Sequence, residues 1–183
     1  MKSFLDLVRA RQSVRRYKPD EVEPDKLNRC LDAARLAPSA SNSQPWTFIV
    51  VDEPELREKV ARQTYDKVIT FNKFVLQAPV LVVFVLEKPK FVTRIGGTIK
   101  NIQYPLIDIG ITAEHFCLQA AEEGLGTCMI GWFNERPIKK LLHIPEKKTI
   151  GLLVTLGYPT EDYKQRGKIR KSFDQVVKYN SYK

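Results

Sequence analysis

Two short clusters of basic residues near opposite ends of the chain have the residue types that bind phosphate. Arg11, Ser13 and Arg15 occupy alternate positions after a helical pattern, so an extended backbone would turn all three side chains to one side. Guanidinium groups bind phosphate oxygens through paired hydrogen bonds, and a hydroxyl can reach a remaining oxygen. Lys168 and Arg170 repeat the arrangement near the C-terminus. The clusters can share one anion only if the fold brings them together, and each alone also fits a solvated basic surface.

The polar stretch from Pro38 to Trp46, with the sequence PSASNSQPW, is a second candidate site. Small hydroxyl and amide residues lie between two prolines, and loops of this kind on a rigid scaffold usually carry function. The stretch offers backbone N–H groups and short hydrogen-bond donors to a planar, polar ligand. The residues do not identify that ligand, and Trp46 fits a packing role at the start of a strand as well as a stacking role.

Alternating helices and strands must position these candidates. Apolar spacing, caps and prolines predict helices from Ser3 to about Arg11 and over 25–37, 54–63, 106–123 and 134–142. Runs rich in β-formers predict strands over 47–51, 80–86, 127–130 and 149–156, with the first covered on both faces. The segment 64–77 is ambiguous, and Phe91–Tyr104, which contains two adjacent glycines, is expected to be a loop or a mobile lid. This alternation indicates an α/β or α+β protein.

Composition fits one soluble domain spanning residues 1–183, with 43% hydrophobic and 28% charged residues. Three cysteines without a CxxC pair indicate a reducing compartment, and no apolar leader or membrane span is visible, so we expect a cytoplasmic protein. The net charge of +9 favours anionic partners, which are phosphate-bearing cofactors, nucleic acids or a membrane surface. His115 and His143 have no metal-ligand or triad company, so we expect structural roles and no metal site.

The motifs together resemble the FMN-dependent nitroreductase family. The segment Arg11–Arg15 followed by 34–46 is similar to the opening of that family, and the similarity continues at 108–110, 124–131, 144–146, 157–159 and 168–170. The resemblance spans nearly the whole chain. It implies an α+β sandwich with a mixed central sheet flanked by helices and a long central dimerisation helix. It also implies an obligate homodimer that binds FMN at each of two subunit interfaces.

The resemblance also implies site residues. The FMN phosphate and ribityl chain would be held by Arg11, Gln12, Ser13, Arg15, Lys168 and Arg170. The isoalloxazine ring would meet a loop of the partner subunit made of Pro38, Ser39, Ala40, Ser41 and Asn42, and its reactive nitrogen would lie near Ile130, Gly131 and Trp132. Asn72 and Lys73 are the candidates for its pyrimidine edge. Because a flavin carries its own hydride chemistry, no catalytic side chain is expected.

The implied activity is a two-step, ping-pong cycle. NADH or NADPH reduces the flavin and leaves, and a nitroaromatic, quinone or similar small molecule then takes the electrons. One alternative keeps the fold for flavin storage or for dehalogenase or flavin-fragmenting chemistry. A remote alternative is a nucleic-acid-binding module built on the basic tail 164–171, but its cations are those that the flavin phosphate needs, and no RNA-binding motif is present. The acceptor and the nicotinamide preference stay open, because no dinucleotide fingerprint is present.

Overall fold

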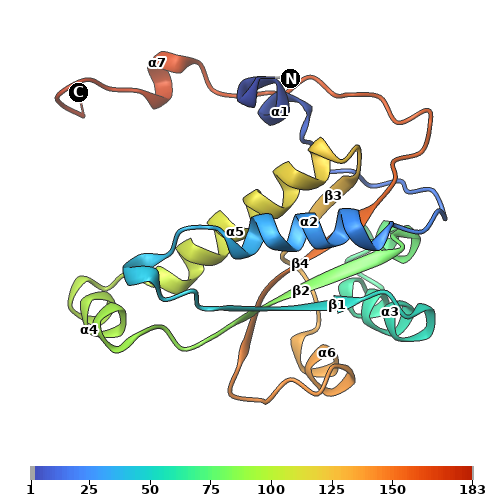
Figure 1. Cartoon of the computed structure of the whole chain (residues 1–183), viewed down its shortest axis with the longest axis horizontal. Helices are drawn as coiled ribbons and strands as arrows, with labels where there is room; N and C mark the ends of the chain where they lie inside the picture. The colour runs from blue at the N-terminus through green and yellow to red at the C-terminus, as the bar shows by residue number, and fades with distance from the viewer. Residues whose placement is uncertain (1–2, 183) are drawn as a thin grey trace.

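The computed structural model describes residues 3–182, and within them a four-stranded sheet lies between two layers of helices (Figure 1). The strand order is β1-β2-β4-β3, with β1 Trp46–Val51, β2 Val80–Leu86, β3 Gly126–Ile130 and β4 Thr149–Gly157. The helices are α1 Phe4–Ala10, α2 Pro24–Arg35, α3 Pro54–Ala61, α4 Phe91–Lys100, α5 Tyr104–Glu122, α6 Glu135–Leu141 and α7 Phe173–Val176. This is the expected α+β class.

Strand β2 divides the hydrophobic core into two halves. Its even-numbered residues Val80, Val82 and Phe84 pack with α2 and α5, whereas the odd-numbered residues between and after them pack with α3 and α6. Successive side chains of a strand point to opposite faces, so a strand covered on both sides must be apolar throughout. The continuous apolar run that predicted this strand is therefore explained and confirmed.

Strand β1 contacts the core on both faces, as predicted, because Ile49 and Val51 pack on the α3–α6 side and Phe48 and Val50 on the α2–α5 side. It lies at the edge of the sheet, pairs only with β2, and is mostly half-buried, with Val51 alone fully buried. Its aromatic residues explain the apolar run: Trp46 stacks on Phe48 at 6.3 Å, and Phe48 meets Phe84 edge-on at 5.0 Å. Trp46 is accordingly a packing residue of the α2–α5 core.

The sheet is less mixed than expected. All three pairings between β1, β2, β4 and β3 are antiparallel. A parallel contact occurs only at an isolated bridge between Ser13 and Thr127, among the residues that the structure describes. The segment after α1 thus runs alongside β3 without forming a full strand, and this contact brings Ser13 to the sheet.

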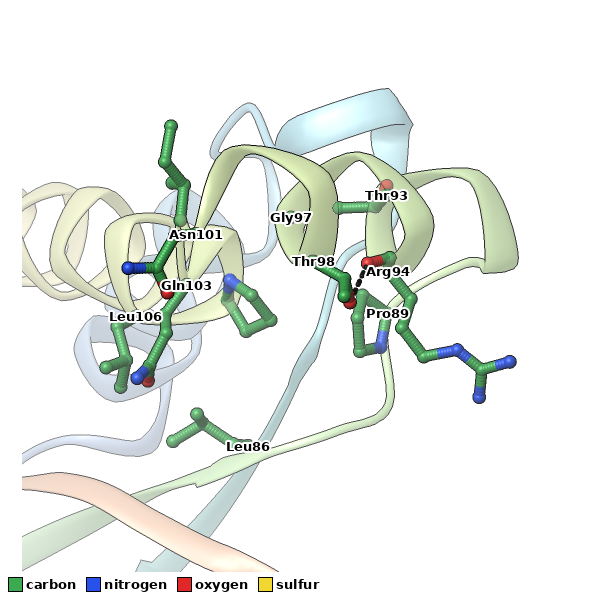
Figure 2. Close-up of a pocket in the computed structure, with 11 residues that line it drawn as sticks. Leu86, Pro89, Thr93, Arg94, Gly97, Thr98, Asn101, Gln103 and Leu106 are labelled. Atoms are coloured by element: carbon green, nitrogen blue, oxygen red, sulfur yellow. Dashed lines mark hydrogen bonds between the residues drawn. The ribbon is translucent and has the colours of Figure 1, made fainter.

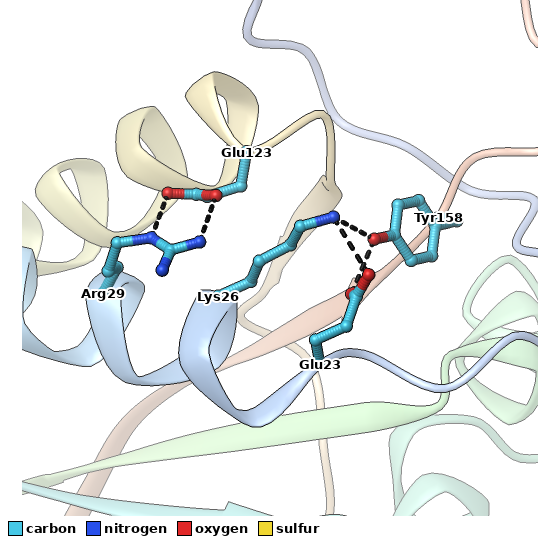
Figure 3. A network of polar contacts seen from close by, with 5 residues as sticks. All are labelled: Glu23, Lys26, Arg29, Glu123 and Tyr158. Atoms are coloured by element: carbon cyan, nitrogen blue, oxygen red, sulfur yellow. Dashed lines mark hydrogen bonds and ion pairs between the residues drawn. The ribbon is translucent and has the colours of Figure 1, made fainter.

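Local signals placed most helix boundaries correctly. Ser3 and Asp6 form a capping box at the start of α1, Pro24 opens α2, and Gly124 follows α5 with a φ of 75°. Figure 3 shows how α2 is tied to its neighbours. Arg29 donates two hydrogen bonds of 2.7 and 2.8 Å to Glu123 at the end of α5, while Lys26, Glu23 and Tyr158 join α2 to the end of β4.

Residues 91–100 form a helix, so the prediction of a loop or mobile lid is wrong there. The helix α4 buries only Thr93 and Gly97, and its large apolar side chains are exposed. This reverses the usual pattern of apolar residues on the buried face. Phe91, Ile95 and Ile99 do recur at helical spacing, but the adjacent glycines Gly96 and Gly97 favoured a loop in the prediction. Gly97 permits the close turn into α5, because a Cβ there would lie 2.7 Å from the Ile102 carbonyl oxygen. Asn101 ends α4 in the left-handed conformation with a φ of 52°.

The ambiguous segment 64–77 contains little regular structure. Short 3-10 turns cover Arg62–Thr64 and Lys73–Gln77, and Phe74 and Val75 pack into the core. Within residues 3–182, no helix is long and apolar enough to cross a bilayer.

Candidate functional site

The two basic clusters meet in one cationic pocket. Residues from the segment after α1 and from the C-terminal tail line a cavity of about 410 Å³, and they are Arg11, Gln12, Ser13, Arg15, Arg166, Gly167, Lys168, Ile169 and Arg170. The tail reaches this place by running beside α1, where Gln165 donates to the Arg9 carbonyl oxygen and Lys168 to that of Val8 (Figure 1). The fold thus meets the condition under which both clusters can share one anion.

Contacts with β3 and two tyrosines fix the segment 11–15. The Val14 N–H donates to the Thr127 carbonyl oxygen at 2.8 Å. Gly126 makes this approach possible, because a Cβ at that position would lie 2.7 Å from a methyl carbon of Val14. The Tyr17 hydroxyl donates to the Val14 carbonyl at 2.8 Å, and the Tyr163 hydroxyl donates to that of Ser13 at 3.0 Å. The sequence pattern did not indicate these contacts of Gly126 or of the tyrosines.

Gln12 holds the tail in place. Its side-chain oxygen accepts from the Arg166 N–H at 3.1 Å, and its side-chain nitrogen donates to the Lys164 carbonyl at 3.4 Å. The Arg166 guanidinium donates to the Ser13 carbonyl at 2.5 Å, so it joins the two clusters directly. The structure therefore adds Arg166 to the pocket. The basic run in the tail was the signal that could have found it.

The pocket carries an excess of positive charge. Five cationic side chains line it, and the ion pair of 3.2 Å between Arg11 and Glu114 provides a carboxylate on one side. Desolvation and the nearby charges of Arg11 and Arg170 lower the pKa of Lys168. Cations held together in this way attract an anion, and guanidinium and ammonium donors around a hydroxyl match the oxygens of a phosphate. The pocket's residues fit the phosphate end of a mononucleotide.

The polar loop, residues Pro38–Asn42, is held in a strained conformation. Ser41 and Asn42 have φ values of 51° and 49°, in the left-handed region that non-glycine residues seldom adopt. The Ala40 N–H donates to the Asp108 carboxylate at 3.0 Å, and the Ser39 hydroxyl accepts from the Gln44 N–H at 2.8 Å. Asp108 is buried in α5, and its second carboxylate oxygen has no hydrogen-bond partner among the described residues. Sequence reasoning quoted Asp108 only as part of a motif.

The third set of predicted site residues follows the end of β3. Ile130 is buried, Gly131 is exposed, and Trp132 exposes about half of its side chain. Buried Asn72 supports this segment, because its side-chain nitrogen donates to the Trp132 carbonyl at 3.2 Å and to the Thr64 carbonyl at 3.1 Å. The Asn72 amide is thus committed to the protein backbone, whereas the neighbouring Lys73 is exposed.

The structure brings together two of the three sets and keeps the third apart. The cationic pocket and the segment 130–132 are linked through β3, since Ser13 pairs with Thr127 of that strand. The polar loop instead lies beside the beginning of α5 and against α4, toward the opposite end of the α2–α5 pair (Figure 1). The polar loop does not line the cationic pocket of the same chain.

Metal-binding residue types do not gather at the site. The described part of the chain contains no group of three or more His, Cys, Asp or Glu side chains that could hold a metal ion. His115 lies half-buried in α5, and His143 lies in the turn after α6 with a φ of 53°.

Comparison with known proteins identifies the fold. The family model described as Nitroreductase family matches residues 8–158. A nitroreductase family protein from Clostridium novyi NT superposes with a TM-score of 0.77 at 33% identity, over 87% of each chain. An FMN-dependent nitroreductase from Clostridium difficile R20291 does so with a TM-score of 0.77 at 27% identity, over 98% of this chain and all of its own. These matches confirm the fold that the resemblance implied.

Two relatives in sequence carry different activities. An NADH dehydrogenase of Thermus thermophilus is 26% identical over 178 residues, which cover 83% of this chain and 84% of the relative. An iodotyrosine deiodinase of Thermotoga neapolitana is 25% identical in an alignment of 202 positions that covers all of both chains. The family match over most of the chain does not depend on either activity, and it establishes that the chain belongs to the nitroreductase family of oxidoreductases.

Proposed function

We propose that this protein is an FMN-dependent NAD(P)H oxidoreductase with a two-step cycle, which passes electrons to a nitroaromatic, quinone or similar small acceptor. The observation that carries the proposal is the cationic pocket, in which Arg11, Ser13 and Arg15 meet Lys168 and Arg170. Family membership and the similarity to an FMN-dependent nitroreductase support the choice of FMN over other phosphate-bearing ligands.

Each set of residues has a binding or orienting role in this proposal. The cationic pocket holds the FMN phosphate and ribityl end, and its fixed backbone spares the cost of ordering these donors on binding. The segment 130–132 lies on the flavin's reactive side, where the exposed Gly131 has no side chain to hold the ring away. FMN supplies the hydride chemistry when bound, so the protein needs no acid–base pair of its own.

The proposed protein is a homodimer. The polar loop 38–42 does not line the cationic pocket of its own chain, and in this proposal the loop of a second subunit contacts the flavin. Apolar side chains that a monomer would leave in water support this arrangement, and they include Phe4, Leu5, Leu36, Phe71, Ile107 and Phe173. We further propose that residues 1–183 form a single domain.

Flavin retention followed by reduction tests the proposal. The purified protein is mixed with FMN, passed through gel filtration, and titrated with NADH or NADPH without oxygen while its visible spectrum is recorded. Retained yellow flavin that bleaches supports the oxidoreductase, and the elution volume reports the dimer. Retained flavin that neither nicotinamide bleaches would indicate flavin storage or specialised flavin chemistry instead. Salt-sensitive oligonucleotide binding without retained flavin would favour the nucleic-acid alternative.

A further inference from the structure

Helix α4 is fastened to the polar loop that we propose to lie against the flavin. The Thr93 hydroxyl donates to the Ala40 carbonyl at 3.2 Å and shares a hydrogen bond of 2.8 Å with the Ser43 hydroxyl. The Lys90 ammonium donates to the Ser41 carbonyl at 3.3 Å, and the backbone N–H of Lys90 donates to the Ser43 hydroxyl at 3.2 Å. A molecule that contacts α4 near Lys90 and Thr93 therefore lies beside the loop.

A pocket of about 450 Å³ opens between α4, the turn into α5 and the end of β2. Figure 2 shows its lining: Leu86, Pro89 and Leu106 provide apolar surface, while Asn101 and Gln103 offer amide groups. A few polar groups on a mostly apolar surface, at this volume, are typical of sites for small organic molecules. Buried Thr93 both lines the pocket and bonds the loop, so the pocket adjoins the loop.

The segment that contains α4 is basic. Between Lys88 and Ile107 the sequence contains four cationic residues and no aspartate or glutamate. No salt bridge within residues 3–182 includes Arg94 or Lys100, and the Arg94 guanidinium lies over the Phe91 ring at 5.3 Å. A cation that no carboxylate neutralises, next to a ring, suits a ligand that carries both negative charge and an aromatic body.

Exposed apolar side chains on α4 add to this preference. Phe91, Val92, Ile95 and Ile99 are 65%, 70%, 42% and 75% exposed. An aromatic ligand that packs against them removes apolar area from water, which stabilises the complex.

We propose that α4 and its pocket select anionic aromatic electron acceptors, such as nitroaromatic carboxylates, over neutral or cationic ones. This inference rests on the proposed function. In the reaction, NAD(P)H is oxidised to NAD(P)+, and its hydride with one proton from water reduces the nitro group to a nitroso group and one water molecule. The carboxylate of the acceptor does not react, and its role is to pair with Arg94, which lines the pocket.

The test compares two acceptors of nearly equal shape, para-nitrobenzoate and para-nitrobenzamide, on protein carrying FMN. Dissociation constants are measured by calorimetry without nicotinamide, and kcat/KM is measured with NADH. We expect the benzoate to be preferred in both measurements, and Arg94→Gln to lower the preference by about two- to fivefold, the range for exposed charge pairs. Lys59→Gln is the matched control, because α3 lies on the other side of the molecule from α4 (Figure 1).

The outcomes separate this inference from the proposed function. Protein that retains FMN and reduces the benzamide, but shows no preference for the benzoate, would overturn the role of α4 and leave the oxidoreductase intact. An equal loss of preference in Lys59→Gln would also overturn it, because the preference would then come from the overall charge of the protein. Protein that retains no FMN would refute the proposed function itself.

Discussion

The Arg15→Ala variant tests how much the phosphate group contributes to FMN binding, apart from the rest of the flavin. Arg15 lines the cationic pocket, is exposed, and makes no salt bridge among the described residues; its guanidinium lies 5.9 Å from the centre of the Phe74 ring. The Arg15→Ala variant should therefore fold normally while losing one cation that faces the phosphate. Riboflavin lacks the phosphate, so its affinity should not depend on this side chain.

The expected loss follows from the strength of a charged hydrogen bond. Such bonds contribute about 1.5–3 kcal/mol. The low end applies because Arg15 is exposed and other cations share the phosphate. A loss of about 1.5 kcal/mol weakens FMN binding about tenfold.

Arg16→Ala is the control for this variant. Arg16 is the next residue along the chain, but it does not line the pocket; it pairs with Asp162 at 2.9 Å, and both side chains are more than half exposed. The Arg16→Ala variant should lose less than about 1 kcal/mol of stability and keep its FMN affinity. Fluorescence titration of each apoprotein with FMN and with riboflavin gives the four affinities. Equal weakening of both flavins by Arg15→Ala, or unchanged FMN binding, would refute the assignment of the phosphate.

Gly126→Ala should reduce stability by about 1–3 kcal/mol through overpacking, since the new methyl group would meet Val14 at 2.7 Å; chemical denaturation should show partial rescue when Val14→Ala is added, and no rescue would contradict the contact. The Tyr158 hydroxyl lowers the pKa of Glu23 from 4.5 to about 2, so Glu23 stabilises the fold fully above pH 4.5 and loses this effect as pH falls through 2. Urea denaturation should therefore show Glu23→Gln less stable than wild type at neutral pH, and a difference that does not shrink below pH 4.5 would contradict this. Burial raises the pKa of Cys30 to about 12, so iodoacetamide should label it only after unfolding in urea, and rapid labelling of the native protein would show that the thiol is accessible.

Regular apolar patterns and strong local signals made much of the fold predictable. The run in β2 and the prolines around α2 act within a few residues, so the sequence shows them directly. Helix α4 has apolar residues at helical spacing, but its adjacent glycines favoured a loop, and that its apolar face points outward is visible only in the fold. The edge position of β1 depends on strand order, which no local pattern contains.

The candidate site, too, was predictable from the sequence only in part. Residue types and alternation indicated phosphate chemistry at Arg11 and Lys168, but only the fold shows that the two chain ends meet. The contributions of Gly126, Arg166 and Asp108 come from tertiary contacts, namely close packing on Val14, a bond across the two clusters and a bond to the polar loop. Such contacts join residues far apart in the sequence.

A crystal structure of the protein with FMN tests the central claim most directly. We predict a dimer in which the phosphate lies within hydrogen-bond distance of Arg15 and Lys168, while the isoalloxazine ring lies against the loop 38–42 of the partner subunit. A phosphate bound outside the cationic pocket, or a flavin enclosed by one subunit alone, would contradict the account.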